Sequence, residues 1–226
     1  NGMYVDGPIL DMKYESGVGR LPIPVVHGLT LGEMAEMANG EGWLKSGGKA
    51  NLKVVPLQGY THQTRYELPV PPSPNLPNMK SIYLYPSLCY FEATPVSLGR
   101  GTDKPFQIYG HPDMKNREFS FTPRSVPGAK NPPQLDRLCH GVDLSGLDDE
   151  EIIAKGINLE YVIDAYKDLG MEGNEFFRPF FELLIGDGDI RGMIAEGKTA
   201  DEIKATWADD VELFKGQRRK YLLYEE

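Results

Sequence analysis

The sequence has no apolar run long enough to span a membrane, and it contains only two cysteines among 226 residues. It is also poor in positive charge, since 24 Lys and Arg stand against 33 Asp and Glu and give a net charge of -9. This charge excludes nucleic acid and anionic membrane surfaces as main partners. The chain starts at Asn1 without a charged and apolar leader, so its compartment cannot be read from this start.

Sequence signatures of metal, nucleotide and serine-hydrolase sites are missing as well. The histidines are dispersed, and no pair has the spacing that brings two ligands to one zinc ion: His27, His62, His111 and His140. The sequence contains neither the G-x-S-x-G turn of serine hydrolases nor a P-loop. We therefore expect no metal and no cofactor.

The two cysteines, Cys89 and Cys139, allow two interpretations. A disulfide between them would close a long loop and stabilise the fold by roughly 3 to 4 kcal/mol. Two buried free thiols fit the sequence equally well. The sequence does not decide between them.

Glycine and proline are abundant, with 25 and 18 residues, which favours a loop-rich α+β domain over a helical bundle. Capping residues predict four helix starts, because their side-chain oxygens accept hydrogen bonds from the free amides of a first turn. These starts are Thr30 with Glu33, Asp148 with Glu151, Asn158, and Thr199 with Glu202. The first helix should end at Gly40.

Short apolar segments between these helices predict the strands of a small mixed or antiparallel sheet. They span residues 52–57, 82–85, 88–91, 105–109, 118–122 and 140–144. We expect one compact domain over residues 1–226, with a loop-rich sheet region and one helix in 1–145 and mostly helix in 146–226.

Residues 71–102 combine prolines, tyrosines, one acid and one arginine between two glycines, and we interpret this stretch as the wall of a binding site. Prolines fix φ and remove backbone donors, so the loop that begins this stretch should be rigid. Rigid loops often carry function. The tyrosines would suit sugar rings, because each has an apolar face and a polar tip.

Arg100 and Glu92 are the charged candidates in this stretch. Gly99 and Gly101 would leave the guanidinium sterically open to a carboxylate or phosphate. A structural salt bridge to Glu92 or Asp103 is the alternative. Glu92 follows an apolar run that could raise its pKa toward use as a general acid, although a lone Glu at this position is more often a structural partner.

Four segments of the chain resemble the exo-β-N-acetylmuramidase (NamZ) family, and they occur in the order found in that family. They are LPIPVVHGLTLGEMAEMAN, VPPSPNLPNMKSIYLYPSLCYFEAT, SLGRGTDKPF and WADDVELFKGQRRKYLLY. The resemblance implies a glycosidase that removes terminal N-acetylmuramic acid from peptidoglycan fragments. It also implies a two-domain protein of which this chain is the C-terminal half, with a Rossmann-like N-terminal half missing.

The resemblance also assigns roles within the site. It implies that Arg100 receives the lactyl carboxylate of muramic acid, and that further contacts come from His27, Ser73, Asn75, Tyr85 and Thr102. Glu92 is then an anchor for Arg100 or one of the paired carboxyls of glycoside hydrolysis. The main acid/base is expected upstream of Asn1, so the fragment alone should be inactive.

The remaining expectations concern partners and place. The protein should act in the periplasm or outside the cell on a peptidoglycan-derived sugar, together with its own N-terminal domain, and a homodimer is left open. The alternative function is a non-catalytic module that binds carbohydrate or cell wall through the same tyrosine-rich surface.

Overall fold

In the computed structural model, which describes residues 3–226, the chain forms two compact units that alternate along the sequence. The first unit comprises Asn1–Tyr66, Ile185–Asp187 and Lys204–Glu226, and the second comprises Glu67–Leu184 and Gly188–Ile203. The expected helical segment 146–226 is therefore divided between the units. The α+β fold class, with small sheets and a helical C-terminal part, is confirmed.

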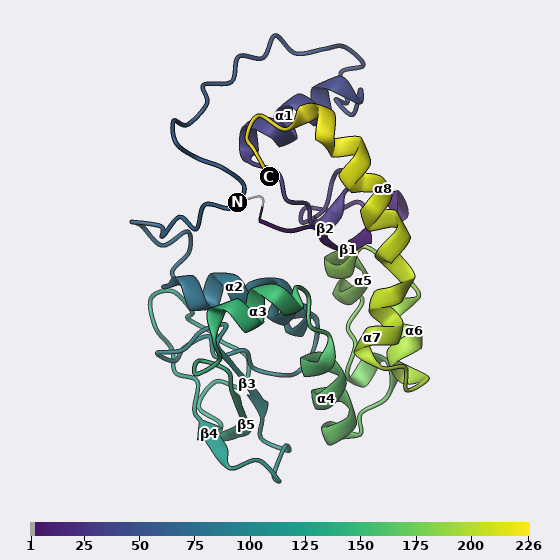
Figure 1. The fold of residues 1–226 in the computed structure, drawn as a ribbon. Helices are drawn as coiled ribbons and strands as arrows, with labels where there is room; N and C mark the ends of the chain where they lie inside the picture. The colour runs from purple at the N-terminus through teal and green to yellow at the C-terminus, as the bar shows by residue number, and fades with distance from the viewer. Residues whose placement is uncertain (1–2) are drawn as a thin grey trace. The chain divides into compact units, whose positions relative to one another are not determined.

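The first unit contains a two-stranded antiparallel sheet and helices from both ends of the chain, coloured purple and yellow in Figure 1. Its elements are β1 (Asp6–Ile9), η1 (Met12–Tyr14), β2 (Pro24–Val26), α1 (Leu31–Gly40), η4 (Ala205–Trp207), α8 (Ala208–Arg218) and η5 (Arg219–Tyr221). The sequence analysis did not predict this sheet, because β1 and β2 are too short to show a period.

Asp6 joins the two ends of the chain within this unit. Its carboxylate accepts hydrogen bonds from Nε1 of Trp207 at 2.9 Å and from Nζ of Lys204 at 2.6 Å. Trp207 is buried, and a buried indole N–H needs such an acceptor. These contacts fix β1 against the segment that leads into α8.

The start of α1 at Thr30 is confirmed, and its capping residue Glu33 has a second role. Glu33 accepts from the amide and hydroxyl of Thr30 at 2.7 and 2.8 Å. The same carboxylate bonds to Nε2 of His62 at 2.9 Å and accepts from the amide of Leu223 at 2.8 Å. One fully buried side chain therefore ties the helix, the following loop and the C-terminal segment together.

Glu33→Gln should lower the free energy of unfolding by about 2 to 3 kcal/mol, because an amide presents N–H groups to partners that already donate. The matched control is Glu202→Gln in the exposed Thr199 capping box, which should cost only about 0.5 to 1 kcal/mol. Urea unfolding of both variants measures the difference. Equal costs for the two variants would contradict the role assigned to Glu33.

The stabilisation of the fold by Glu33 should depend on pH in a definite direction. Burial alone would raise the pKa of Glu33, but hydrogen bonds from Thr30, Leu223 and His62 outweigh burial and leave the pKa lowered. The charged carboxylate therefore stabilises the fold above its unfolded-state pKa, and this contribution is lost as the pH falls through the lowered value. The stability gap between wild type and Glu33→Gln should shrink in acid.

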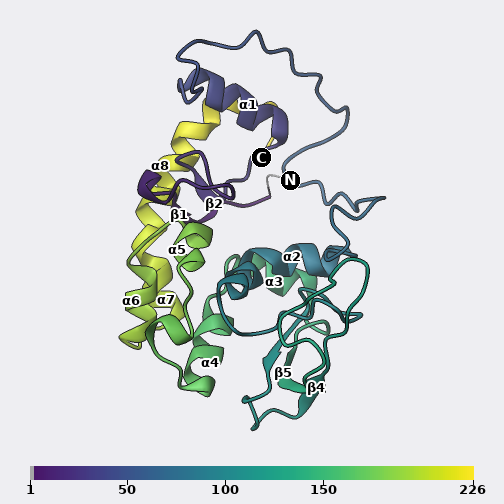
Figure 2. The ribbon, with the colours of Figure 1, turned by 180° about the vertical axis from the view of Figure 1, so that it is seen from behind.

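The second unit holds a three-stranded sheet with helices packed beside it (Figure 2). Its elements are α2 (Met79–Leu88), η2 (Cys89–Ala93), β3 (Ile108–His111), β4 (Phe119–Phe121), β5 (Cys139–Asp143), α3 (Asp149–Lys155), α4 (Glu160–Leu169), η3 (Gly173–Glu175), α5 (Phe180–Ile185), α6 (Ile190–Ala195) and α7 (Ala200–Lys204). Helix α2 packs against α3 and α4.

The sheet has the order β3-β5-β4 and is antiparallel throughout, which confirms the strands expected near residues 105–109, 118–122 and 140–144. Gly110 and Gly141 lie opposite each other in the register. A Cβ on Gly141 would come within 1.9 Å of the carbonyl oxygen of Tyr109. The two glycines therefore permit an unusually close approach of β3 and β5.

The other predicted helix starts are also confirmed. Asp148 accepts from the first-turn amides at the start of α3, and Asn158 accepts from the amide of Glu160 at 2.9 Å at the start of α4. Thr199 and Glu202 form the capping box of α7. Gly170 ends α4 in the left-handed conformation, as expected for a helix C-terminus.

The strands predicted at residues 82–85 and 88–91 are wrong, because this region forms α2 and η2. Asn78 and Ser81 make a reciprocal capping box that starts the helix. Leu84 and Leu88, four positions apart, are both fully buried and form the inner face of α2. These apolar residues are buried, as the sequence predicts, but their spacing is that of a helix and not of a strand.

The strand predicted at residues 52–57 is also wrong, because this segment has no regular structure. Val55 and Leu57 are 80% and 65% exposed, so they have no sheet to pack against.

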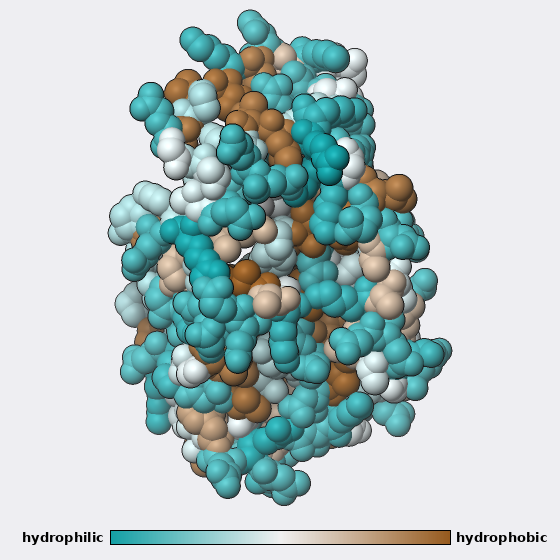
Figure 3. All heavy atoms as spheres, in the orientation of Figure 1, coloured by the Kyte–Doolittle hydropathy of each residue, from teal (hydrophilic) through white to brown (hydrophobic). Residues whose placement is uncertain are grey.

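Charged and polar residues cover most of the face drawn in Figure 3. Within the described residues, no helix combines the length and apolar character needed to cross a membrane.

Candidate functional site

The candidate site is built on the loop from Leu98 to Phe106 in the second unit. The amide of Phe106 donates to the carbonyl of Leu98 at 2.8 Å and closes the loop at its base. Inside it, the amide of Thr102 donates to the carbonyl of Gly99 at 3.0 Å. These bonds make a compact turn with Arg100 near its tip.

The two glycines beside Arg100 are required by contacts within the protein. Both have positive φ, at 79° for Gly99 and 81° for Gly101. A Cβ on Gly99 would lie 2.6 Å from the carbonyl oxygen of Lys104, and one on Gly101 would lie 2.3 Å from that of Arg124. The sequence analysis attributed these glycines to ligand access, whereas the structure gives them a packing role.

Arg100 forms an ion pair with Glu92, which η2 holds beside the loop. Of the two acids considered from sequence, Glu92 is therefore the partner and Asp103 is not. The side chain of Arg100 is 32% exposed and that of Glu92 is 22% exposed. The Arg100 side chain is therefore only partly buried.

Two aromatic rings complete the surroundings of Arg100. Its guanidinium carbon lies 5.1 Å from the ring centroid of Phe106, within the range of a cation-π contact. The ring of Phe106 in turn contacts that of Tyr85, with 5.0 Å between centroids. Burial, with smaller effects of Cys89 and Glu92, raises the pKa of Tyr85 to about 12, so its phenol stays neutral and can donate.

The hydroxyl of Thr102 supports the loop itself. It donates to the carbonyl of Gly99 at 2.7 Å and accepts from the amide of Lys104 at 3.1 Å. Lys104 is further held by Asp143 of β5, with its Nζ at 2.5 Å from the carboxylate. Thr102 therefore shapes the turn, and its role in ligand binding stays a prediction.

Ser73 and Asn75 stiffen the proline-rich loop. The Ser73 hydroxyl accepts from the amide of Asn75 at 3.2 Å, and the buried Asn75 amide group donates to the carbonyl of Gly128 at 3.0 Å. Segment 123–136 also supports the Arg100 loop, since the amide of Arg124 donates to the carbonyl of Gly101 at 2.9 Å. One segment thus connects the two loops that were predicted to form the binding wall.

His27 belongs to the first unit, whereas the residues above belong to the second. Its Nδ1 accepts from the amide of Leu29 at 3.1 Å, so it caps its own loop, which was one of the two alternatives considered. Burial lowers the pKa of His27 to about 4, and the charge of Arg218 contributes less to this shift. The imidazole is therefore neutral around pH 7 and carries no charge for an anion.

Cys89 and Cys139 are both free and buried, which decides between the two interpretations left open by the sequence. Burial raises the pKa of Cys89 to about 12 and that of Cys139 to about 11, so both thiols are protonated and unreactive.

Among residues 3–226 the structure shows no group of three or more side chains that could hold a metal ion.

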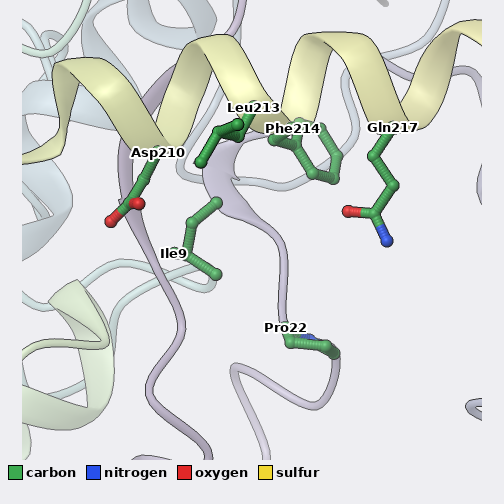
Figure 4. A pocket seen from close by; sticks show the side chains of 6 residues that line it. All are labelled: Ile9, Pro22, Asp210, Leu213, Phe214 and Gln217. Atoms are coloured by element: carbon green, nitrogen blue, oxygen red, sulfur yellow. The ribbon is translucent and has the colours of Figure 1, made fainter.

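Two hollows have linings that include no residue of the Arg100 loop, one in each unit. The hollow in the first unit has a volume of about 350 Å³ and lies between α8 and the segments around β1 and β2 (Figure 4). Its lining contains a single acid, Asp210, and is otherwise apolar or neutral: Ile9, Pro22, Leu213, Phe214 and Gln217. The second measures about 180 Å³ and is lined by residues of α3, α4 and the loop before α3. Neither lining includes Arg100.

Phe106 is the site residue that the sequence analysis missed. Its ring contacts both Arg100 and Tyr85, yet nothing in its local sequence indicates this contact. The positive φ of Phe106, at 55°, is set by the closure of the loop and is not visible in a sequence pattern.

Comparison with protein-family models gives two matches that together span most of the chain. The model described as "Exo-beta-N-acetylmuramidase NamZ, C-terminal" matches residues 83–224, and the corresponding N-terminal model matches residues 1–80. The expectation that this chain resembles the C-terminal half alone is therefore wrong, because its first 80 residues match the N-terminal model.

Similar proteins come from two bacteria. The peptidoglycan beta-N-acetylmuramidase NamZ of Bacillus subtilis (strain 168) is 36% identical over 239 residues, which cover 99% of this chain and 56% of that protein. A DUF1343 family protein of Bacteroides fragilis is 68% identical with a TM-score of 0.98, and the match covers 100% of this chain and 64% of that one. A second protein of B. fragilis, at 22% identity and a TM-score of 0.79, shares the fold and covers 99% of this chain and 63% of that one. The chain thus spans little more than half the length of the B. subtilis relative.

Proposed function

Because this chain belongs to the exo-beta-N-acetylmuramidase NamZ family, we propose that it is part of a glycoside hydrolase that acts on N-acetylmuramic acid in peptidoglycan. The B. subtilis relative is named as a peptidoglycan beta-N-acetylmuramidase, and its similarity runs through both matched regions. Peptidoglycan lies in the cell wall, so we place the protein in the periplasm or outside the cell.

The observation that carries the proposal is the partly exposed side chain of Arg100, whose guanidinium pairs with an acid and contacts an aromatic ring. N-acetylmuramic acid differs from a neutral N-acetylhexosamine by its lactyl carboxylate. A guanidinium has five N–H donors, and Glu92 engages it through Nη2. The donors that remain suit a substrate carboxylate, and the partly exposed side chain of Tyr85 offers an apolar surface for the sugar.

Glu92 serves as the anchor of Arg100 in this proposal. A carboxylate that is ion-paired with a guanidinium is charged and has no proton to give to a leaving group. The contact with Arg100 therefore favours positioning over general acid catalysis. We assign Ser73, Asn75 and Thr102 to the support of the two loops, on the basis of their hydrogen bonds.

Release of a chromogenic aglycone from a β-glycoside of N-acetylmuramic acid tests the proposal. We expect the full-length protein that contains this chain to release the aglycone from this glycoside faster than from the matching glycoside of N-acetylglucosamine. Retention of peptidoglycan fragments without any release of sugar would instead favour the non-catalytic binding module.

A further inference from the structure

Phe106 has a backbone conformation that is rare for a large side chain. Its φ is 55°, in the left-handed region, and the residue is only 1% exposed. Within residues 3–226, the other non-glycine residues with positive φ are Gln134 and Asp136. Both belong to segment 123–136, which supports the Arg100 loop, and strained residues of this kind cluster at functional sites.

The closure of the loop does not explain why this residue is aromatic. The amide of Phe106 donates to the carbonyl of Leu98 at 2.8 Å, and a glycine would make the same bond without steric cost. What a glycine would lack is the ring, whose centroid lies 5.1 Å from the guanidinium carbon of Arg100 and 5.0 Å from the ring centroid of Tyr85.

We propose that Phe106 is a positioning residue that holds the Arg100 guanidinium for recognition of an acidic sugar. The proposal rests on the function proposed above and adds a residue that determines specificity. Glu92 fixes the guanidinium through an ion pair, and the face of Phe106 fixes it through a cation-π contact. Two contacts of different kinds restrict the rotamers of a long side chain.

Fixing Arg100 in this way lowers the entropic cost of binding a carboxylate. A free arginine side chain loses rotamer freedom when it binds a ligand, and a pre-organised one has already lost it. The gain applies only to ligands that use the guanidinium. The ring should therefore raise the affinity for an acidic sugar and leave that for a neutral sugar unchanged.

Calorimetric titration with N-acetylmuramic acid and with N-acetylglucosamine tests this inference on the whole protein. Phe106→Leu keeps an apolar side chain but removes the π face, and we expect its affinity for N-acetylmuramic acid to fall about 3- to 10-fold. Its affinity for N-acetylglucosamine should not change. Phe106→Tyr restores the π face and should restore the preference for the acidic sugar.

The remaining outcomes are distinguishable. If Phe106→Leu folds and keeps the wild-type preference, the ring is ordinary core and the inference is wrong. If Phe106→Leu does not fold, Tyr85→Leu and Phe106→Tyr decide, because removal of the Tyr85 ring should loosen Phe106 and reduce the same preference. A wild-type protein that binds neither sugar, or both equally, also overturns the inference.

Hydrolysis of the chromogenic glycosides is measured in parallel. Preferential binding of N-acetylmuramic acid that Phe106→Leu reduces, without any hydrolysis, contradicts the proposed glycosidase but supports the role of Phe106. Hydrolysis of the glycoside with a preference that Phe106→Leu does not alter contradicts the role of Phe106 alone.

Discussion

Arg100→Gln should lower kcat/KM for a β-glycoside of N-acetylmuramic acid by about 10- to 100-fold. A hydrogen bond to a charged group contributes about 1.5 to 3 kcal/mol, and each 1.4 kcal/mol corresponds to a factor of ten. Glutamine is similar in shape to the end of the arginine side chain but carries no charge and offers fewer donors. The loss should therefore appear only with substrates that bear the lactyl carboxylate.

Two controls make this prediction specific. A glycoside of N-acetylglucosamine lacks the carboxylate, so its kcat/KM should change little in the variant. Arg124→Gln removes an arginine from the supporting segment, where its side chain is 66% exposed and pairs with the 62% exposed Asp136. Such a surface pair contributes little, so this variant should behave as the wild type. Equal losses with both glycosides would rule out carboxylate recognition by Arg100.

Gly101→Ala should destabilise the protein by about 2 to 5 kcal/mol. The φ of 81° costs an alanine about 1 to 2 kcal/mol. The new Cβ would also lie 2.3 Å from the carbonyl oxygen of Arg124, and such overpacking costs a further 1 to 3 kcal/mol, roughly. The contact is with backbone, which cannot rotate away, so the loop or segment 123–136 must move. Urea unfolding measures the loss.

Gly170→Ala is the matched control for this substitution. Gly170 also has a positive φ, at 59°, but no atom lies within 4 Å of the position of its Cβ. The Gly170→Ala variant should therefore lose only the stability that corresponds to the backbone conformation, about 1 to 2 kcal/mol. If the two variants were equally stable, the close contact between Gly101 and Arg124 would have no energetic role. A displaced loop should also carry Arg100 with it and reduce activity on the acidic glycoside.

Hydrogen bonds between residues close together in the chain made the helix starts predictable. The capping boxes at Thr30 and Thr199 were visible because each needs only two side chains three positions apart, and both form as expected. The box at Asn78 and Ser81 has the same spacing but was overlooked beside the apolar, aromatic run that follows. Leu84 and Leu88 show that this run has a helical period, so the error lay in the choice between two periods for a short apolar segment.

The pairing of Arg100 with Glu92 was predictable because the two residues carry opposite charges and lie close together in the chain. Arg100 and Glu92 are eight positions apart, and their pairing was one of two alternatives that the sequence offered. Tyr85 was expected near Arg100, but the contact between them runs through Phe106, which has no sequence signal. Conversely, His27 caps its own loop in the other unit, where the sequence left open a contact with an anion.

By itself the sequence determined the family, the α+β class and most helix starts, because motifs in order, composition and capping depend on residues close together in the chain. The tertiary structure decided the division into two units, the free state of the cysteines and the surroundings of Arg100. It also decided the role of glycines such as Gly101, where a Cβ would clash with the backbone of Arg124. These features depend on contacts between segments far apart in the chain, and no local pattern encodes which segments will meet.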